Sequence, residues 1–99
     1  MPRPKSPRCL NFSPDVYYFK PRGIPLRELE EVVLLADEVE AVKLHDADGL
    51  EQIAAAEKMN ISQPTFARTL DAAYKKIADA LINGKAIRIE NISDIRKGL

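Results

Sequence analysis

The chain has 99 residues, of which 45% are hydrophobic and 30% charged, and its formal net charge is zero. That size and composition indicate one small globular domain. Six aromatic residues and no Trp predict an aliphatic core that suits packed helices better than a large sheet. One Cys and one His exclude an internal disulfide and leave no plausible set of zinc ligands. Because no apolar run approaches the roughly 20 residues that span a bilayer, and no secretory signal opens the chain, we expect a cytoplasmic protein without membrane contact.

The zero net charge hides an uneven distribution along the chain. Residues 1–27 carry six basic groups and one acid, residues 28–57 carry ten acids and one base, and residues 58–99 carry eight bases and four acids. The acidic middle has two interpretations. It is either the solvent face of the first helices or a contact surface for a basic partner, such as part of the transcription machinery.

The first 25 residues are predicted to form an extended basic arm followed by an irregular segment. Prolines alternate with Arg3, Lys5 and Arg8, and proline disfavours both helix and sheet. Residues 9–12 are expected to form a short strand, and residues 17–19 to cover the core rather than to stack on bases. Residues 26–35 fit either a helical turn or a short strand. The expected organisation is therefore an arm over residues 1–25, a helical domain over 26–84, and a short strand with a tail over 85–99.

A first helix is predicted from Asp37, which we expect to act as its N-cap, to a point before Gly49. The sequence His45-Asp-Ala-Asp-Gly49 gathers an imidazole and two carboxylates. Neighbouring residues cannot encircle a metal, and a calcium loop needs further acids at set spacings. We interpret this segment as the solvated end of the helix. Cys9 has no base near it in sequence and is expected to be a buried or incidental thiol.

Two further helices are predicted after Gly49. The second runs roughly over residues 50–59, and Asn60 follows it where a left-handed residue commonly ends a helix. Ser62 caps the third helix, Pro64 falls in its first turn, and Gly84 ends it near residue 83. Its apolar stripe is expected to face the core and comprises Phe66, Leu70, Ala73, Ile77 and Leu81. Residues 86–89 alternate like a strand, which we expect to pair with residues 10–12 of the same chain or across a dimer.

The second and third helices have the layout of a helix-turn-helix, with the turn at residues 59–62. Ala56 supplies the small residue of the first of these helices, and the shared core is predicted at Met59, Ile61, Phe66 and Leu70. In that layout the second helix of the pair lies in the DNA major groove. Alanine-rich helix pairs also occur in plain bundles, so the pattern alone leaves both interpretations open.

The outward face of the third helix carries the predicted DNA contacts. At about 100° per residue, Pro64, Arg68, Asp71 and Lys75 lie roughly 140° to 200° from Phe66. Arg68 suits guanine or phosphate, and Gln63 suits adenine. Ser62, Thr65 and the backbone N–H groups at the start of the helix would bind phosphate, and the basic arm would add charge attraction. The full set of predicted DNA-binding residues is Ser62, Gln63, Pro64, Thr65, Ala67, Arg68, Asp71, Lys75 and Lys76, together with Arg3, Lys5 and Arg8 of the arm.

Several motifs in order resemble the uncharacterised protein family 0251. They are YFKPRGIPL at 18–26, DEVEAVKLHDADGL at 37–50, AAEKMNIS at 55–62, PTF at 64–66, Arg68, KIA at 76–78 and GK at 84–85. The resemblance implies a mainly α fold, with a three-helix helix-turn-helix core like region four of bacterial sigma factors. It also implies DNA binding. Some relatives carry a further domain resembling nitrogenase cofactor-biosynthesis proteins, which we expect a chain of this length to lack.

Three departures from the family pattern concern the same helix pair. Asn60 stands where glycine is usual, Gln63 where arginine is frequent, and Ile53 and Ala54 where acids are usual. The sequence predicts a sequence-specific DNA-binding protein, acting as a transcription regulator on double-stranded DNA. It predicts no catalytic activity, metal or cofactor. A homodimer and a transcription-machinery partner are further expectations. The alternative is a protein-interaction module that uses the acidic helices and does not bind DNA.

Overall fold

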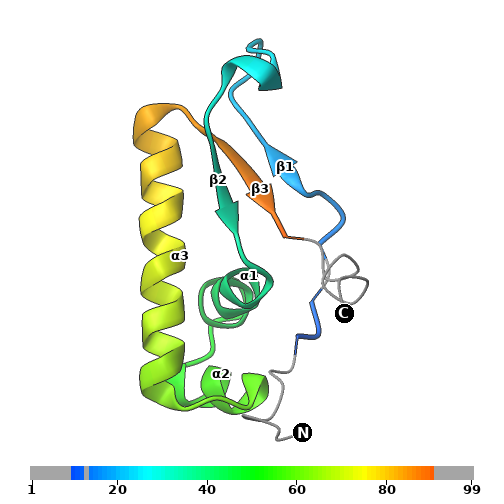
Figure 1. Cartoon of the computed structure of the whole chain (residues 1–99). Helices are drawn as coiled ribbons and strands as arrows, with labels where there is room; N and C mark the ends of the chain where they lie inside the picture. The colour runs from blue at the N-terminus through cyan, green and yellow to red at the C-terminus, as the bar shows by residue number, and fades with distance from the viewer. Residues whose placement is uncertain (1–9, 13, 91–99) are drawn as a thin grey trace, which may run out of the picture.

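The computed structural model describes residues 10–12 and 14–90, and this part of the chain is mainly helical. It contains three α-helices and one three-stranded sheet (Figure 1). The longest helix stands beside the sheet, while the two shorter helices lie near its N-terminal end. In chain order the elements are β1 (Tyr18–Phe19), the 3₁₀ turn η1 (Leu26–Glu28), β2 (Glu31–Leu34), α1 (Ala36–Val42), the π-helical turn η2 (Lys43–Ala47), α2 (Gln52–Met59), α3 (Gln63–Asn83) and β3 (Ala86–Ile89).

The sheet has the order β1-β3-β2, so the last strand lies at its centre. Tyr18 pairs antiparallel with Arg88, and Val32 pairs parallel with Ile87. The predicted strand at residues 86–89 is confirmed, but its predicted partner is wrong, because residues 10–12 form no strand. Pairing of β3 across a dimer is also wrong, since strands of the same chain occupy both of its edges. The ambiguous segment at residues 26–35 contains both expected elements, η1 and β2.

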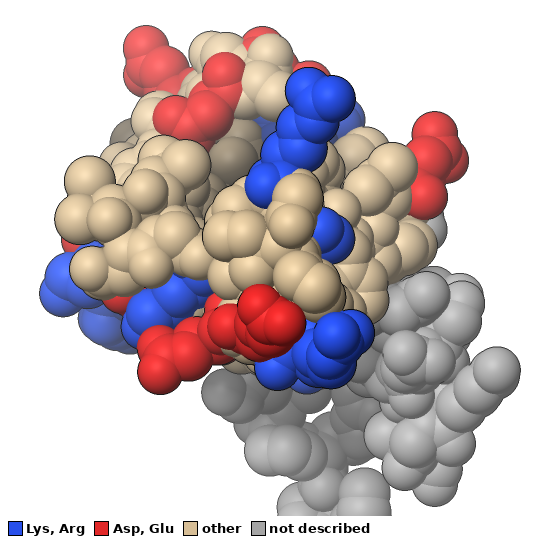
Figure 2. Space-filling model, turned by 90° about the horizontal axis from the view of Figure 1, so that it is seen from above, with Lys and Arg blue, Asp and Glu red and all other residues tan. Residues whose placement is uncertain are grey.

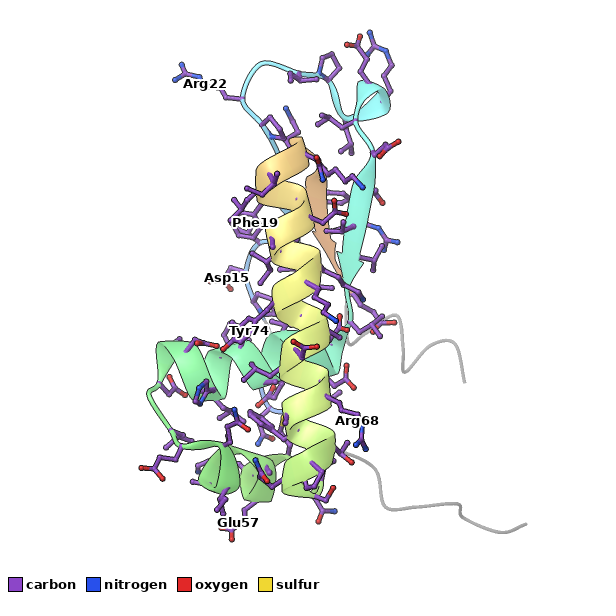
Figure 3. The ribbon with its side chains drawn as sticks, turned by 90° about the vertical axis from the view of Figure 1, so that its left-hand side faces the viewer. Asp15, Phe19, Arg22, Glu57, Arg68 and Tyr74 are labelled. Atoms are coloured by element: carbon purple, nitrogen blue, oxygen red, sulfur yellow. The ribbon has the colours of Figure 1, made fainter. Side chains whose placement is uncertain are left out.

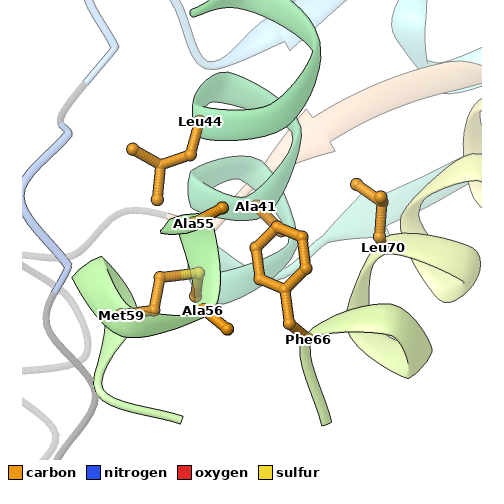
Figure 4. Close-up of a cluster of buried hydrophobic side chains, with 7 residues drawn as sticks. All are labelled: Ala41, Leu44, Ala55, Ala56, Met59, Phe66 and Leu70. Carbon is orange, nitrogen blue, oxygen red and sulfur yellow. The ribbon is translucent and has the colours of Figure 1, made fainter. Parts of the chain in front are cut away.

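Two hydrophobic clusters share the apolar face of α3. The first joins α1, η2, α2 and the start of α3 and comprises Ala41, Leu44, Ala55, Ala56, Met59, Phe66 and Leu70 (Figure 4). The second lies between α3 and the sheet and is formed by Leu34, Ala73 and Ile89, with Ile77 packed against it. The predicted core of the helix pair is therefore confirmed. Leu81 was expected in the same stripe but is 75% exposed, and Ala80 is buried instead, because the last turn of α3 turns Ala80 rather than Leu81 toward its neighbours.

The start of α1 differs from the prediction. The N-cap residue is Leu35, and Asp37 lies in the first turn. A leucine side chain has no acceptor, so carboxylates satisfy the first backbone donors of the helix. Glu38 Oε1 accepts from the Leu35 N–H at 2.8 Å, and Glu90 Oε1 accepts from the Ala36 N–H at 3.0 Å. The second carboxylate comes from 54 positions along the chain, which sequence spacing does not reveal.

Two acids of the acidic middle are buried rather than part of a solvent face. Glu38 is 5% exposed and Glu40 is 3% exposed. Glu40 Oε1 accepts from the Phe12 N–H at 2.9 Å, which fixes the N-terminal segment to α1. Lys76 Nζ donates to Glu38 Oε1 and to the Val33 carbonyl, both at 2.8 Å. Lys76 therefore joins α3, α1 and β2 through one ammonium group.

Replacing Lys76 should destabilise the fold while replacing its neighbour Lys75 should not. Lys76→Ala leaves a buried carboxylate without its cation, so we expect the free energy of unfolding to fall by about 1–3 kcal/mol. Lys75 is exposed and pairs with Asp71 at 3.4 Å, so Lys75→Ala should change it by less than about 0.5 kcal/mol. Urea denaturation of both variants measures the difference. Equal effects would show that the Lys76 contacts do not stabilise the fold.

Candidate functional site

The turn between α2 and α3 is fixed by a left-handed residue. Asn60 has φ 59° and ψ 43°, as predicted. Its N–H donates to the Glu57 carbonyl and the Ile61 N–H donates to the Ala56 carbonyl, each at 3.1 Å. These two bonds form a Schellman motif, which satisfies carbonyls that the end of α2 would otherwise leave unpaired. The chain consequently turns within three residues, between Met59 and Gln63, and starts α3 at a fixed angle to α2.

The start of α3 is capped as predicted. Ser62 Oγ accepts from the Thr65 N–H at 3.2 Å, and the Ser62 carbonyl accepts from the Phe66 N–H at 2.9 Å. Pro64 is the second residue of the helix, where its missing N–H removes no intrahelical bond. Backbone and cap together therefore hold the first turn of α3 in place.

Phe66 anchors this helix pair from beneath. Phe66 and Met59 are the two largest fully buried side chains among the described residues, and Ala56 beside them is small enough for α2 to approach closely. The ring of His45 meets Phe66 edge-on, with centroids 6.5 Å apart. Its Nδ1 donates to the Leu50 carbonyl at 2.7 Å, since a carbonyl oxygen can only accept. His45 is therefore part of the packing, whereas the following residues 46–49 are exposed as predicted.

The outward face of α3 carries the predicted row of polar residues. Gln63, Pro64, Arg68, Asp71 and Lys75 are all exposed, and Figure 3 shows Arg68 projecting from the N-terminal half of the helix. Thr65 and Ala67, beside them in sequence, are half-buried. One face of α3 is thus committed to the core, while the opposite face points to solvent.

Two contacts organise the outward residues. Gln63 Nε2 donates to Gln52 Oε1 at 3.0 Å, which ties the first turn of α3 to the first turn of α2. Arg68 Nη2 lies 3.4 Å from Thr65 Oγ1, a long contact that leaves the guanidinium held only lightly. The sequence does not indicate a role for Gln52, because its contact with Gln63 depends on the angle between the two helices.

Arg68 also lines a shallow groove between α3 and the start of α1. The groove has a volume of about 380 Å³, and its walls include Asp37, Glu38, Thr65 and Thr69. Its lining is mostly polar in character. An arginine and two carboxylates therefore lie close together at the edge of the outward face. The sequence did not predict that α1 lies beside Arg68, because the two are about 30 residues apart in the chain.

One predicted site residue, Lys76, lies elsewhere in the structure, and three others are not described. Lys76 faces α1 and β2, where its charge is offset by Glu38, so it is not part of the outward row. Arg3, Lys5 and Arg8 lie outside the described residues. Within the described residues, 14 acids outnumber 10 bases. Lys58, which was not among the predicted DNA-binding residues, is an exposed base near the end of α2.

Tyr74 links α3 to the π-helical turn. Its hydroxyl lies 2.6 Å and 2.8 Å from the two carboxylate oxygens of Asp46. Removal of water from the hydroxyl, followed by the hydrogen bond to Asp46 and the charge of that group, raises the pKa of Tyr74 to about 12. This contact fixes η2 against the middle of α3. Figure 3 shows Tyr74 on the side of α3 that faces the viewer's left.

No group of three or more His, Cys, Asp or Glu side chains in the described part of the chain is placed to hold a metal ion. Among the helices of the same residues, none combines the length and apolar character needed to cross a bilayer.

Residues 1–96 match the model of a family described as "Protein of unknown function DUF134". The chain belongs to this family. Among its relatives, a UPF0251 protein of Moorella thermoacetica is 58% identical over 90 residues, which cover 91% of this chain and 60% of the relative. The chain thus spans less than two thirds of that relative's length.

This chain matches a larger share of two other members of the family. A UPF0251 protein of Caldanaerobacter subterraneus is 56% identical over 91% of this chain and 76% of its own. One from Desulfosudis oleivorans is 53% identical over 99% of this chain and 71% of its own. The predicted membership of the uncharacterised family 0251 is confirmed. No solved structure matches the chain significantly.

The left-handed turn predicts opposite effects for two substitutions at Asn60. Asn60→Gly should raise the free energy of unfolding by up to about 0.5 kcal/mol, because glycine adopts positive φ without steric cost. Asn60→Ala should lower it by about 1 kcal/mol, since alanine lacks the polar side chain that eases this conformation. Chemical denaturation of the two variants against the parent chain is the measurement. A stabilising alanine would contradict the turn geometry.

Tyr74 should lose its proton at a higher pH than an ordinary tyrosine. With a folded pKa of about 12 against an ordinary value of 10, its stabilising contribution is complete below pH 10 and is lost as the pH rises from about 10 to 12. Absorbance titration of the parent chain minus Tyr74→Phe isolates this group. Asp46→Asn should lower the pKa only in part, because the loss of water around the hydroxyl, the first cause of the shift, remains. A parent value near 10 would refute the contact.

Proposed function

We propose that this chain binds double-stranded DNA with the α2–α3 pair acting as a helix-turn-helix like that of sigma factor region four, and that it serves as a transcription regulator. The observation that carries the proposal is the row of exposed polar side chains on the first turns of α3, opposite the buried face that holds Phe66. In a helix-turn-helix the start of the second helix meets the base edges of the major groove.

The chemistry of the row supports contacts with both bases and phosphates. The Arg68 guanidinium has five donors in a planar fork, which suits guanine or a phosphate, and its long contact with Thr65 costs little to exchange. Gln63 gives one N–H to Gln52, but a primary amide has a second N–H and an acceptor oxygen. The contact with Gln52 therefore leaves one N–H and the oxygen of the amide for the bidentate pairing that glutamine makes with adenine.

In this proposal the sequence-independent attraction to DNA comes from the N-terminal arm. The described residues carry more acids than bases, Asp71 belongs to the outward row, and Asp37 lines the groove beside Arg68. Phosphate attraction needs an excess of cations. In this proposal Arg3, Lys5 and Arg8 provide that excess, while α3 provides the base contacts.

Replacing Arg68 should weaken DNA binding without unfolding the protein. With a labelled duplex selected for binding from a random-sequence pool, at low salt, Arg68→Ala should reduce affinity by at least about fivefold, the loss of roughly one good polar contact. Arg22→Ala is the matched control, because Arg22 lies at the opposite end of the molecule (Figure 3) and should change affinity by less than about twofold. Fluorescence anisotropy measures binding, and circular dichroism verifies the fold.

The same assay separates the roles of arm and helix and tests the alternative function. Exchanging Arg3, Lys5 and Arg8 for Gln should flatten the slope of log affinity against log salt by about 2–3, whereas Arg68→Ala should flatten it by about 1 or less. Unchanged binding by Arg68→Ala would remove the major-groove proposal. A parent chain that does not bind DNA even at low salt would instead favour the interaction module predicted from the acidic helices and the exposed Ile53.

A further inference from the structure

The end of the molecule farthest from α2 leaves large apolar side chains uncovered. Leu81 is 75% exposed and Ile82 is 82% exposed at the end of α3, and Phe19 of β1 is 55% exposed. Figure 2 looks down on this end and shows a broad area that is neither acidic nor basic, with charged groups around it. In Figure 3 Phe19 lies against the flank of the upper half of α3.

A groove joins Phe19 to Leu81, and Ile82 is the next residue at the same helix end. It has a volume of about 420 Å³, lies between the end of α3 and the sheet, and has a mostly apolar lining. Phe19 and Leu81 line it together with Pro21, Ala80 and Ile87. We call the surface formed by Phe19, Pro21, Leu81, Ile82 and Ile87 the end patch.

The end patch is large enough to be a candidate binding surface. Its three most exposed side chains together present on the order of 400 Å² of apolar surface, a size at which a patch on a monomer often has a binding role. Leu81 and Ile82 are adjacent in sequence on an exposed helix end, where polar residues would serve the helix equally well. The sequence thus places large apolar side chains where the described part of the chain leaves them in contact with water.

We propose that the end patch packs against the same patch of a second copy of this chain, in a two-fold dimer. A homodimer interface of standard size buries about 800 Å² per partner, of which about 65% is apolar, or roughly 500 Å². The end patch supplies most of that area. Ile24 and Leu26, also large and exposed, lie in the connection between β1 and β2 at the same end of the molecule (Figure 1) and would supply the remainder.

The charges around the end patch favour a copy of itself over a partner of one strong charge. Lys85 contacts Asp79 at 2.9 Å and Glu30 at 3.5 Å, beside the groove, and Lys20 lies on the groove wall. Both signs therefore occur at the rim, so two identical rims can meet without net repulsion. A two-fold axis places a patch against itself, which requires this kind of self-complementarity.

The dimer does not depend on DNA binding and uses the other end of the molecule. A helix of 21 residues is about 30 Å long at 1.5 Å per residue. The end patch lies at its C-terminal end and the Ser62 cap at its N-terminal end. Both α2–α3 pairs thus stay uncovered in the dimer, and DNA affinity and dimerisation are separable properties of the chain.

Sedimentation equilibrium of the full chain over micromolar to hundred-micromolar concentrations tests the proposal. The parent chain should form a reversible dimer, and the double variant Leu81→Lys, Ile82→Lys should raise its Kd at least about tenfold. Its circular dichroism should be unchanged, because both side chains are already in contact with water. If the double variant loses its fold, Leu81→Lys alone applies the same test at an exposed position that lines the groove.

Ile53→Lys is the matched control. Ile53 is 64% exposed on α2, at the other end of the molecule, and its replacement should leave the Kd unchanged. A parent chain that stays monomeric over the whole range would overturn the proposal. So would a double variant that dimerises as tightly as the parent, or a dimer that only Ile53→Lys dissociates.

Discussion

The packing of Phe66 and of the apolar stripe that continues from it along α3 is the interaction on which the rest of the structure depends. One helix face serves two clusters: Phe66 and Leu70 fill the space between α1 and α2, and Ala73 and Ile77 pack against the sheet. A chain of this size has little core area to spare. Using one 21-residue helix as the shared wall of both clusters joins the helical part and the sheet into a single unit.

That arrangement fixes which side chains can reach a partner. Because the buried stripe cannot rotate, Gln63, Arg68 and Lys75 are held outward on the opposite face, and the Schellman turn at Asn60 sets the angle of α2 beside them. Proposed DNA contacts on the first turns of α3 and a proposed dimer surface on its last turn occupy opposite ends of the same rigid element. One helix would then supply both interactions without competition between them.

The buried carboxylates give α1 its place between the two clusters. Glu38 and Glu90 accept from the first N–H groups of α1, Glu40 accepts from Phe12, and Lys76 neutralises Glu38 from α3. A buried carboxylate needs such partners, since an unpaired one is costly. Part of the strongly acidic run at residues 28–57 therefore holds the fold together and is not available to a partner or to solvent.

The sequence by itself determined the features that arise from contacts between residues close together in the chain, such as the helix ends and the buried face of α3. Asn60, Ser62, Pro64 and Gly84 begin and end helices through contacts within a few residues, and the spacing of Phe66, Leu70, Ala73 and Ile77 selects the buried face. The outward position of Arg68 follows from that spacing. Only the tertiary structure decided the features that depend on distant segments. These are the central position of β3 in the sheet, the hydrogen bond from Ala36 at the start of α1 to Glu90, and the inward position of Lys76. The pairing of Gln63 with Gln52 and the exposure of Leu81 belong to the same group. Each of these is set by which element lies opposite, and periodicity within one segment carries no information about that neighbour.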